Sequence, residues 1–254
     1  MIKYPLHCFG DSFTCGTELV DYKYVQNYPS YLGYNDWSKL PASQRQRPPI
    51  DQSNIKKIEM EEHQNSYVGL LGGVNHGIAG CSLQTIQRLV IDHLEHSRSK
   101  NIIVIQPTGI ERWSEYVHNK WKDYIGGVMS QDAGDLEKQY LRFRLSNSTQ
   151  FSNLLLWHNC LLTLIEYVKS HRNTADYWII NNGSFNEITT LLGPSKISDP
   201  MLQNTLTYLK DKTINFPQVE DMQYPYFCIG GHVNIEAHKE LAQRLQFALS
   251  RYYR

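Results

Sequence analysis

The sequence lacks an excess of charge of either sign. Its 25 basic residues are balanced by 25 acidic residues over 254 positions, so the formal net charge is zero. Proteins that bind nucleic acid or a membrane surface usually carry a strong electrostatic field of one sign. The balanced charge therefore predicts neither kind of partner. No stretch reaches the apolar length of a membrane span, and the first residues lack the apolar core of a signal peptide. We therefore expect a protein made in the cytoplasm whose ligand is a small neutral molecule or a protein surface.

Paired cysteines are also lacking. The chain has five cysteines and no C-x-x-C pair, and an odd number argues against a disulfide framework or a zinc ribbon. Cys8, Cys81 and Cys228 each lie beside a motif described below. Because free cysteine is a common small buried residue, these neighbours do not predict a thiol site. The sequence also contains no internal repeat and no low-complexity tract.

Short apolar runs alternate with helical periodicity along the chain. A β-branched run such as Ile102-Ile103-Val104-Ile105 is typical of the middle of a parallel sheet. Expected strands cover residues 3–9, 70–75, 101–106 and 175–180, and expected helices start after Ser82, cover 154–168, and start after Asn234. This order predicts a three-layer α/β fold with a mainly parallel, flavodoxin-like sheet of about five strands. We take residues 1–254 as a single domain.

Two segments interrupt the alternation and are interpreted as insertions. Residues 41–64 carry prolines and charge blocks, which favour an exposed connection, and we assign no regular structure there. Residues 113–150 are rich in Trp and Tyr. Trp113, Trp121 and Tyr124 approximate helical spacing, which predicts a helix that packs its aromatic side chains on the core. An aromatic wall over a sugar-like ligand is the second interpretation.

Three segments combine glycine with residues that can do chemistry. A serine hydroxyl is a poor nucleophile unless a base, most often a histidine, lies within hydrogen-bond reach. Ser12 and His232 supply such a pair. Acyl transfer also needs preorganised donors for an oxyanion, and the backbone amides of Ser12 and Gly80 are candidates because glycine allows close approach. The three segments are Gly10-Asp11-Ser12, the run from Asn75 to Ser82, and the run from Gly230 to His238.

These motifs resemble the conserved blocks of the SGNH hydrolases, also called GDSL esterases and lipases. In that family a first strand runs into G-D-S, as at Gly10-Asp11-Ser12, and a second block contains a glycine like Gly80. The last block carries a histidine ahead of a helix, as at His232. The order and placing of the blocks along the chain also agree with the family. The resemblance implies the flavodoxin-like fold, a serine ester hydrolase and no cofactor.

The chain departs from the family at the acid of the last block. The family has an aspartate three residues before the histidine, and Ile229 stands in that position. Neither Cys228 nor Gly230 could replace it after a slip of one residue. A backbone carbonyl or a carboxylate from elsewhere can hold the imidazole instead. Glu220 and Asp221 are the nearest upstream carboxylates.

A second departure lies after the middle strand, where the family has G-x-N-D and its asparagine serves the oxyanion hole. Glu111 stands where a neutral donor is expected, and an ionised carboxylate would repel an oxyanion. Two interpretations are open: Thr108 or Gln106 donates instead, or Glu111 pairs with Arg112 and orders the loop. The replacement resembles variants found in phage-encoded members of the family. Candidate substrate contacts are Asp11, Glu111, Arg112 and Trp113.

Other polar residues near the motifs have structural interpretations. Asp11 is expected to cap the turn rather than to carry a proton. His76 is expected to bond to a loop carbonyl, and His238 to face the packing surface of the last helix. Because His232 and His238 lack same-face helical spacing and a nearby set of further ligands, no metal site is predicted.

The sequence thus predicts a serine esterase that forms an acyl-enzyme, with Ser12 as nucleophile, His232 as base and then acid, and help from Thr108 at the oxyanion. A carbohydrate O-deacetylase acting on an acylated small molecule or glycan is the specific hypothesis. A non-catalytic structural or glycan-binding protein of a phage virion, with protein partners in a larger assembly, is one alternative. An O-acyltransferase is another.

Overall fold

A computed structural model describes residues 3–25, 39–41, 49–117, 119–125, 138–139, 144, 150–182, 209–217 and 232–252. Five parallel strands form the central sheet in the order β2-β1-β3-β6-β7. With these five strands numbered in chain order, this is the 2-1-3-4-5 order of the flavodoxin-like fold. The predicted α/β class and mainly parallel sheet are therefore confirmed. The strands are β1 (Leu6–Phe9), β2 (Val74–Asn75), β3 (Asn101–Ile105), β6 (Thr174–Asn181) and β7 (Thr213–Asn215).

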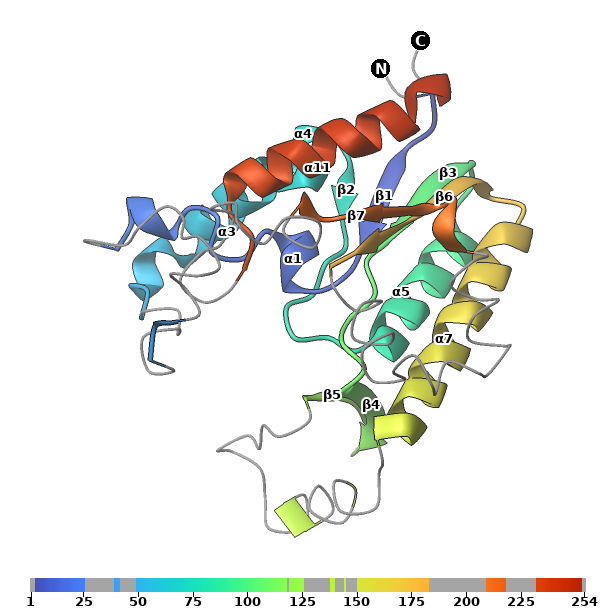
Figure 1. The fold of residues 1–254 in the computed structure, drawn as a ribbon, viewed down its shortest axis with the longest axis horizontal. Helices are drawn as coiled ribbons and strands as arrows, with labels where there is room; N and C mark the ends of the chain where they lie inside the picture. The colour runs from blue at the N-terminus through green and yellow to red at the C-terminus, as the bar shows by residue number, and fades with distance from the viewer. Residues whose placement is uncertain are drawn as a thin grey trace.

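Helices cover both faces of the sheet (Figure 1). Helices α5 (Leu83–His96) and α7 (Gln150–Ser170) pack on one face, and α4 (Tyr67–Leu70) and α11 (Ile235–Ala248) pack on the other. Neighbouring residues of β3 point to opposite faces, so the whole strand is buried and reads as one apolar run. Among the described residues, no helix is long and apolar enough to cross a membrane.

Three helices begin at the predicted capping residues. Ser82 accepts a hydrogen bond from the Thr85 amide at the start of α5, and Asn234 accepts bonds from two amides at the start of α11. Asp11 accepts from the Phe13 amide and caps the short helix α1 (Ser12–Cys15). Each cap satisfies amides that the helix itself leaves without partners.

The expected exposed connection at 41–64 contains a helix, which corrects that expectation. Helix α3 (Ile55–Asn65) follows a 3₁₀ turn, Gln52–Asn54, and only Ile58 and Glu62 of its side chains are buried. These two residues are four positions apart and share one face. The helical periodicity of this segment is weak in the sequence, because a single apolar residue and one buried carboxylate make up the inner face of an otherwise polar helix.

The helix expected from the aromatic spacing in 113–150 is wrong. Strands β4 (Arg112–Val117) and β5 (Lys120–Ile125) form an antiparallel hairpin instead. Asn119, with φ of 61°, adopts the left-handed conformation that short hairpin loops need. Trp113 and Tyr124 are directly opposite each other and stack with ring centroids 5.7 Å apart. Cross-strand pairing, rather than helical spacing, explains the aromatic pattern.

Two strand boundaries also differ from the expectation. Residues 70–75 were expected as one strand, but Leu70 ends α4 and only Val74–Asn75 form β2. Gly72, with φ of 68°, turns the chain between the two elements. Strand β7 lies in the proline-broken region 184–227, where no strand was predicted, and its three residues are too few to show a period.

Candidate active site

Ser12 lies just beyond the carboxyl end of β1, at the start of α1. The chain passes from β1 to β2 on one side and then returns to β3 on the other, so the strand order reverses at this point. Ligands of open α/β sheets bind at such a reversal. A Cβ atom on Gly10 would lie 2.1 Å from Oγ1 of Thr14, so only glycine fits the approach to the serine.

His232, which precedes α11, meets Ser12 across 220 positions of sequence. Its Nε2 lies 2.9 Å from Oγ of Ser12, which is hydrogen-bond distance. Its other nitrogen, Nδ1, lies 3.2 Å from Oε2 of Glu18. Nδ1 makes no hydrogen bond among the described residues, so Glu18 is a carboxylate within ion-pair distance of this nitrogen and does not accept a hydrogen bond from it. Catalytic contacts of this kind commonly align when substrate binds.

Glu18 is the residue that sequence reasoning missed. Its side chain is buried, and its φ of 71° lies in the left-handed region that glycine favours. Such a conformation costs a glutamate on the order of 1–2 kcal/mol. Oε1 of Glu62 accepts a bond of 2.6 Å from the Glu18 amide and holds the backbone there. The strained residue is therefore the one that presents a carboxylate to His232.

The position of Ile229 lies outside the described residues, as do Glu220 and Asp221. The structure places a different carboxylate, from the segment after α1, beside the imidazole. In the sequence, the apolar pair Leu19-Val20 after Glu18 is the only hint that this acid is buried. Neither the positive φ of Glu18 nor its contact with His232 is indicated by the neighbouring residues in the sequence.

Asp11 is buried at the centre of a second polar network. Its Oδ1 accepts from Nε2 of Gln106 at 2.7 Å, and its Oδ2 accepts from Nη1 of Arg112 at 3.1 Å. Oε1 of Gln106 accepts in turn from Thr14 at 2.6 Å. Burial raises the pKa of Asp11, and the guanidinium of Arg112 opposes that rise. The network positions the turn before Ser12.

Replacing Arg112 by Met is expected to lower the free energy of unfolding at pH 7 by about 3 kcal/mol, because Asp11 stays buried without its positive partner. The change also raises the pKa of Asp11 further. The folded state then binds a proton more readily than the unfolded state, so the loss shrinks as the pH falls through the raised pKa. Urea unfolding at pH 7 measures the loss of stability, and its repetition at pH 5 measures how far that loss shrinks.

The double variant Asp11→Asn, Arg112→Met provides the control. It removes the uncompensated charge and is expected to recover part of the stability and to lose the added pH dependence. A single variant that is equally unstable at both pH values would contradict this account of Asp11.

The segment from Asn75 to Ser82 lies against both sides of Ser12. The Ile78 amide donates to the Gly10 carbonyl at 2.9 Å, and Nδ2 of Asn75 donates to the Thr14 carbonyl at 2.8 Å. Gly80 has a φ of 78°, and no atom of the described residues, apart from its own chain neighbours, lies within 4 Å of a Cβ placed there. Among the described residues, the amides of Ser12 and Gly80 donate to no acceptor. Both N–H groups can therefore serve a ligand.

The other predicted site residues have defined places. The carbonyl of Thr108 accepts from Trp157 at 2.7 Å, while its hydroxyl is buried without a hydrogen-bond partner among the described residues. Both ends of the Gln106 amide are used by Asp11 and Thr14. Oε1 of Glu111 lies 4.0 Å from Nε of Arg112. A role for Thr108 at the oxyanion stays a prediction.

Trp113, the remaining candidate contact, is mostly buried against Tyr124. The exposed aromatic residues of the hairpin are Tyr116 and Trp121, whose rings lie 5.4 Å apart. The carboxylate of Asp123 accepts from Ser82, so the hairpin is tied to the end of the Gly80 segment. The hairpin therefore adjoins the site at its base and carries an aromatic pair farther along.

The structure agrees with the expectation for His238 and differs from the expectation for His76. His238 is buried in α11, and its Nδ1 accepts from the Tyr67 amide at 3.0 Å. Burial lowers its pKa to about 3, so it is a neutral structural residue. His76 was expected to bond to a loop carbonyl, but its Nε2 lies 3.0 Å from Nδ1 of His7. That expectation for the His76 side chain is wrong, because the ring turns toward β1 and not toward the loop.

The fold and this geometry define a doubly wound α/β protein with a serine, a histidine and a glutamate at the reversal point of its sheet. This is the fold class that the SGNH-like motifs implied. No protein-family model matches the sequence, and no curated protein matches it significantly.

Three solved structures are similar over nearly the whole chain. One is a carbohydrate esterase family 2 enzyme with a carbohydrate-binding domain, from Corynascus thermopiles (Myceliophthora fergusii); it is 13% identical with a TM-score of 0.48 over 98% of this chain. This chain spans only 66% of that protein's length. The second is a member of the lipolytic G-D-S-L family from Veillonella parvula, 12% identical with a TM-score of 0.48, over 97% of this chain and 98% of that one.

The third is an α/β hydrolase from the metagenome of Lake Arreo, Spain. It is 9% identical with a TM-score of 0.46, over 100% of this chain and 98% of that one. Identities and scores this low assign no activity to the chain, so its chemistry has to come from its own residues.

Proposed function

We propose that the chain is a serine ester hydrolase that works through an acyl-enzyme. The observation that carries the proposal is the chain of contacts from Ser12 Oγ to His232 Nε2, at 2.9 Å, and from His232 Nδ1 to Glu18, at 3.2 Å. Nucleophile, base and orienting acid in this order are the geometric signature of an activated serine. The absence of an acid at Ile229 therefore does not favour an inactive scaffold.

The proposed reaction has two steps, the formation of the acyl-enzyme and its hydrolysis by water. Ser12 Oγ attacks the ester carbonyl carbon while His232 Nε2 takes the hydroxyl proton. We assign the oxyanion to the amides of Ser12 and Gly80, because preorganised N–H donors stabilise the charge that develops there. His232 then gives its proton to the leaving alkoxide. In the second step it takes a proton from the water that attacks the acyl-enzyme and returns it to Ser12 Oγ as the bond to the acyl group breaks and the acid leaves. Glu18 faces the imidazolium at Nδ1 in both steps.

A fluorophosphonate probe tests this function directly, because it reacts with activated serines. We expect the folded protein to take up one equivalent, and mass spectrometry of the digest to locate the label on Ser12. Heat-denatured protein should remain unlabelled and serves as the control. No labelling of the folded protein, or a label on another residue, would exclude the proposal and favour a binding or structural protein.

We further propose that the substrate is an O-acetylated carbohydrate. The exposed pair Tyr116 and Trp121 supports this, because flat aromatic faces suit sugar rings and the hairpin adjoins the site. Trp121→Ala should lower acetate release from acetylated xylan at least 10-fold while p-nitrophenyl acetate hydrolysis stays within twofold. Equal effects on both substrates contradict the glycan assignment. Acetyl transfer to an added sugar, with little free acetate, would instead identify an acyltransferase.

A further inference from the structure

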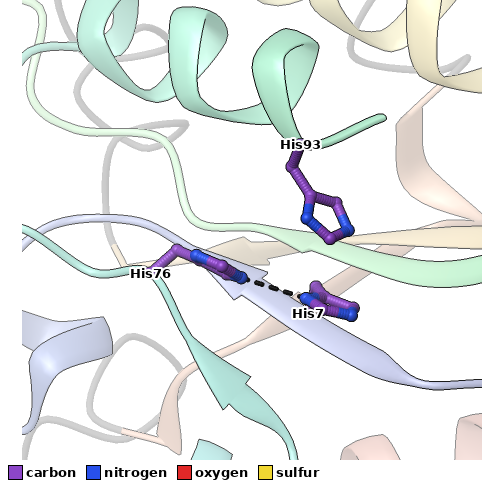
Figure 2. A group of neighbouring side chains, drawn as sticks. All are labelled: His7, His76 and His93. Carbon is purple, nitrogen blue, oxygen red and sulfur yellow. Dashed lines mark hydrogen bonds between the residues drawn. The ribbon is translucent and has the colours of Figure 1, made fainter. Parts of the chain in front are cut away.

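Three histidines from separate parts of the chain meet beside the edge of the sheet (Figure 2). His7 belongs to β1, His76 follows β2, and His93 lies in the last turn of α5. One ring nitrogen of each lies within 4.8 Å of the other two, and His7 Nδ1 and His76 Nε2 are only 3.0 Å apart. None of the three belongs to the Ser12, His232 and Glu18 set.

The cluster is packed and incompletely satisfied. His76 stacks on Phe9 with centroids 4.4 Å apart, and His7 lies 4.0 Å from His93. All three imidazoles are half-buried, yet Nε2 of His93 is buried with no hydrogen-bond partner among the described residues. A buried polar atom without a partner is costly, and this nitrogen has its bonding capacity free for a ligand.

The chemistry of the cluster suits a metal ion. Three imidazoles from separate segments form the donor set, and neutral imidazole is the form that binds metals. Imidazole nitrogen is a preferred ligand of zinc, copper and nickel.

The distances also fit. Zn–N bonds of 2.0–2.1 Å in a tetrahedral site place ligand nitrogens about 3.3 Å apart. The His7–His76 contact is already close to that separation, and the ligand nitrogen of His93 lies within 4.8 Å of the other two. The nitrogen that now donates between His7 and His76 would move its proton to the opposite side of its ring.

We propose that His7, His76 and His93 bind one divalent cation of the zinc class through three imidazole nitrogens, with the fourth position open to water. The ion would link β1, the segment after β2, and α5 at the edge of the sheet. Because His76 lies four residues before Gly80, it would also anchor the segment that supplies a candidate oxyanion amide. The site differs in residues and chemistry from the serine centre.

Titration of tag-free, EDTA-treated protein with Zn²⁺, monitored by calorimetry, tests the site. A parallel titration uses Co²⁺ as a spectroscopic probe. We expect one equivalent of Zn²⁺ to bind and Co²⁺ to give the visible bands of a tetrahedral site. His93→Gln is expected to weaken Zn²⁺ binding at least about 100-fold, because even the outer partners of metal ligands contribute 10- to 100-fold. His96→Gln, an exposed histidine on the same helix, is the matched control and should bind as the unaltered protein does.

The proposal fails if the unaltered protein binds neither ion at micromolar concentrations, or if His93→Gln binds Zn²⁺ as tightly as His96→Gln. Should His93→Gln not fold, the Co²⁺ spectrum of the unaltered protein decides, because octahedral or absent bands exclude a three-histidine tetrahedral site. Fluorophosphonate labelling of Ser12 is measured in parallel, so a failure here is distinct from a failure of the proposed esterase.

Discussion

Replacing Glu18 by Gln is expected to slow ester hydrolysis by about 10⁴-fold, the loss that amidation of the orienting acid causes in the serine-protease template. The amide can no longer balance the positive charge that forms on His232, and it can hold the imidazole in the wrong tautomer. The rate of p-nitrophenyl acetate hydrolysis measures the effect. The left-handed backbone at residue 18 should be retained, because Gln and Glu have the same shape.

Glu62→Gln provides a matched control for Glu18→Gln. Both residues are buried glutamates of the same region, but Glu62 contributes an acceptor for the Glu18 amide, and a glutamine carbonyl oxygen can still provide that acceptor. We expect its hydrolysis rate to stay within about 10-fold of the unaltered protein. If the two variants lose activity equally, Glu18 is a structural residue and another group orients His232.

Replacing Ser12 by Ala is expected to lower the hydrolysis rate by about 10⁶-fold, as loss of the nucleophile does in subtilisin. The residues of such a set act as one unit, so their effects are not additive. Adding Glu18→Gln to Ser12→Ala should therefore cost almost nothing further, although Glu18→Gln alone costs about 10⁴-fold. A comparison of the three variants at one substrate concentration, with circular dichroism as a folding check, measures this.

A further loss in the double variant would show that Glu18 acts independently of the serine. Residual activity in Ser12→Ala close to that of the unaltered protein would show that hydrolysis does not depend on this serine. Either result would separate the observed geometry from the proposed chemistry.

Local sequence patterns predicted the scaffold and the position of the serine well. The β-branched run at 101–106 indicated a strand with two covered faces, and Ser82 and Asn234 marked helix starts, because burial period and capping depend on residues close together in the chain. Local patterns were misleading at 113–125. There the same aromatic spacing fits a helix or a hairpin, and the pairing of Trp113 with Tyr124 decides between them.

Ser12, named from a tripeptide and its position, can be found without a structure because a strand that ends in Gly-Asp-Ser is a local feature. The acid beside His232 cannot be found that way. Glu18 reaches Nδ1 of His232 through a positive φ and a contact between residues 214 positions apart, and neither has a sequence signature. The cluster of His7, His76 and His93 depends in the same way on strand register and on how α5 packs. The chain's local chemistry thus specified the fold and the candidate nucleophile, and only long-range packing decided what surrounds them.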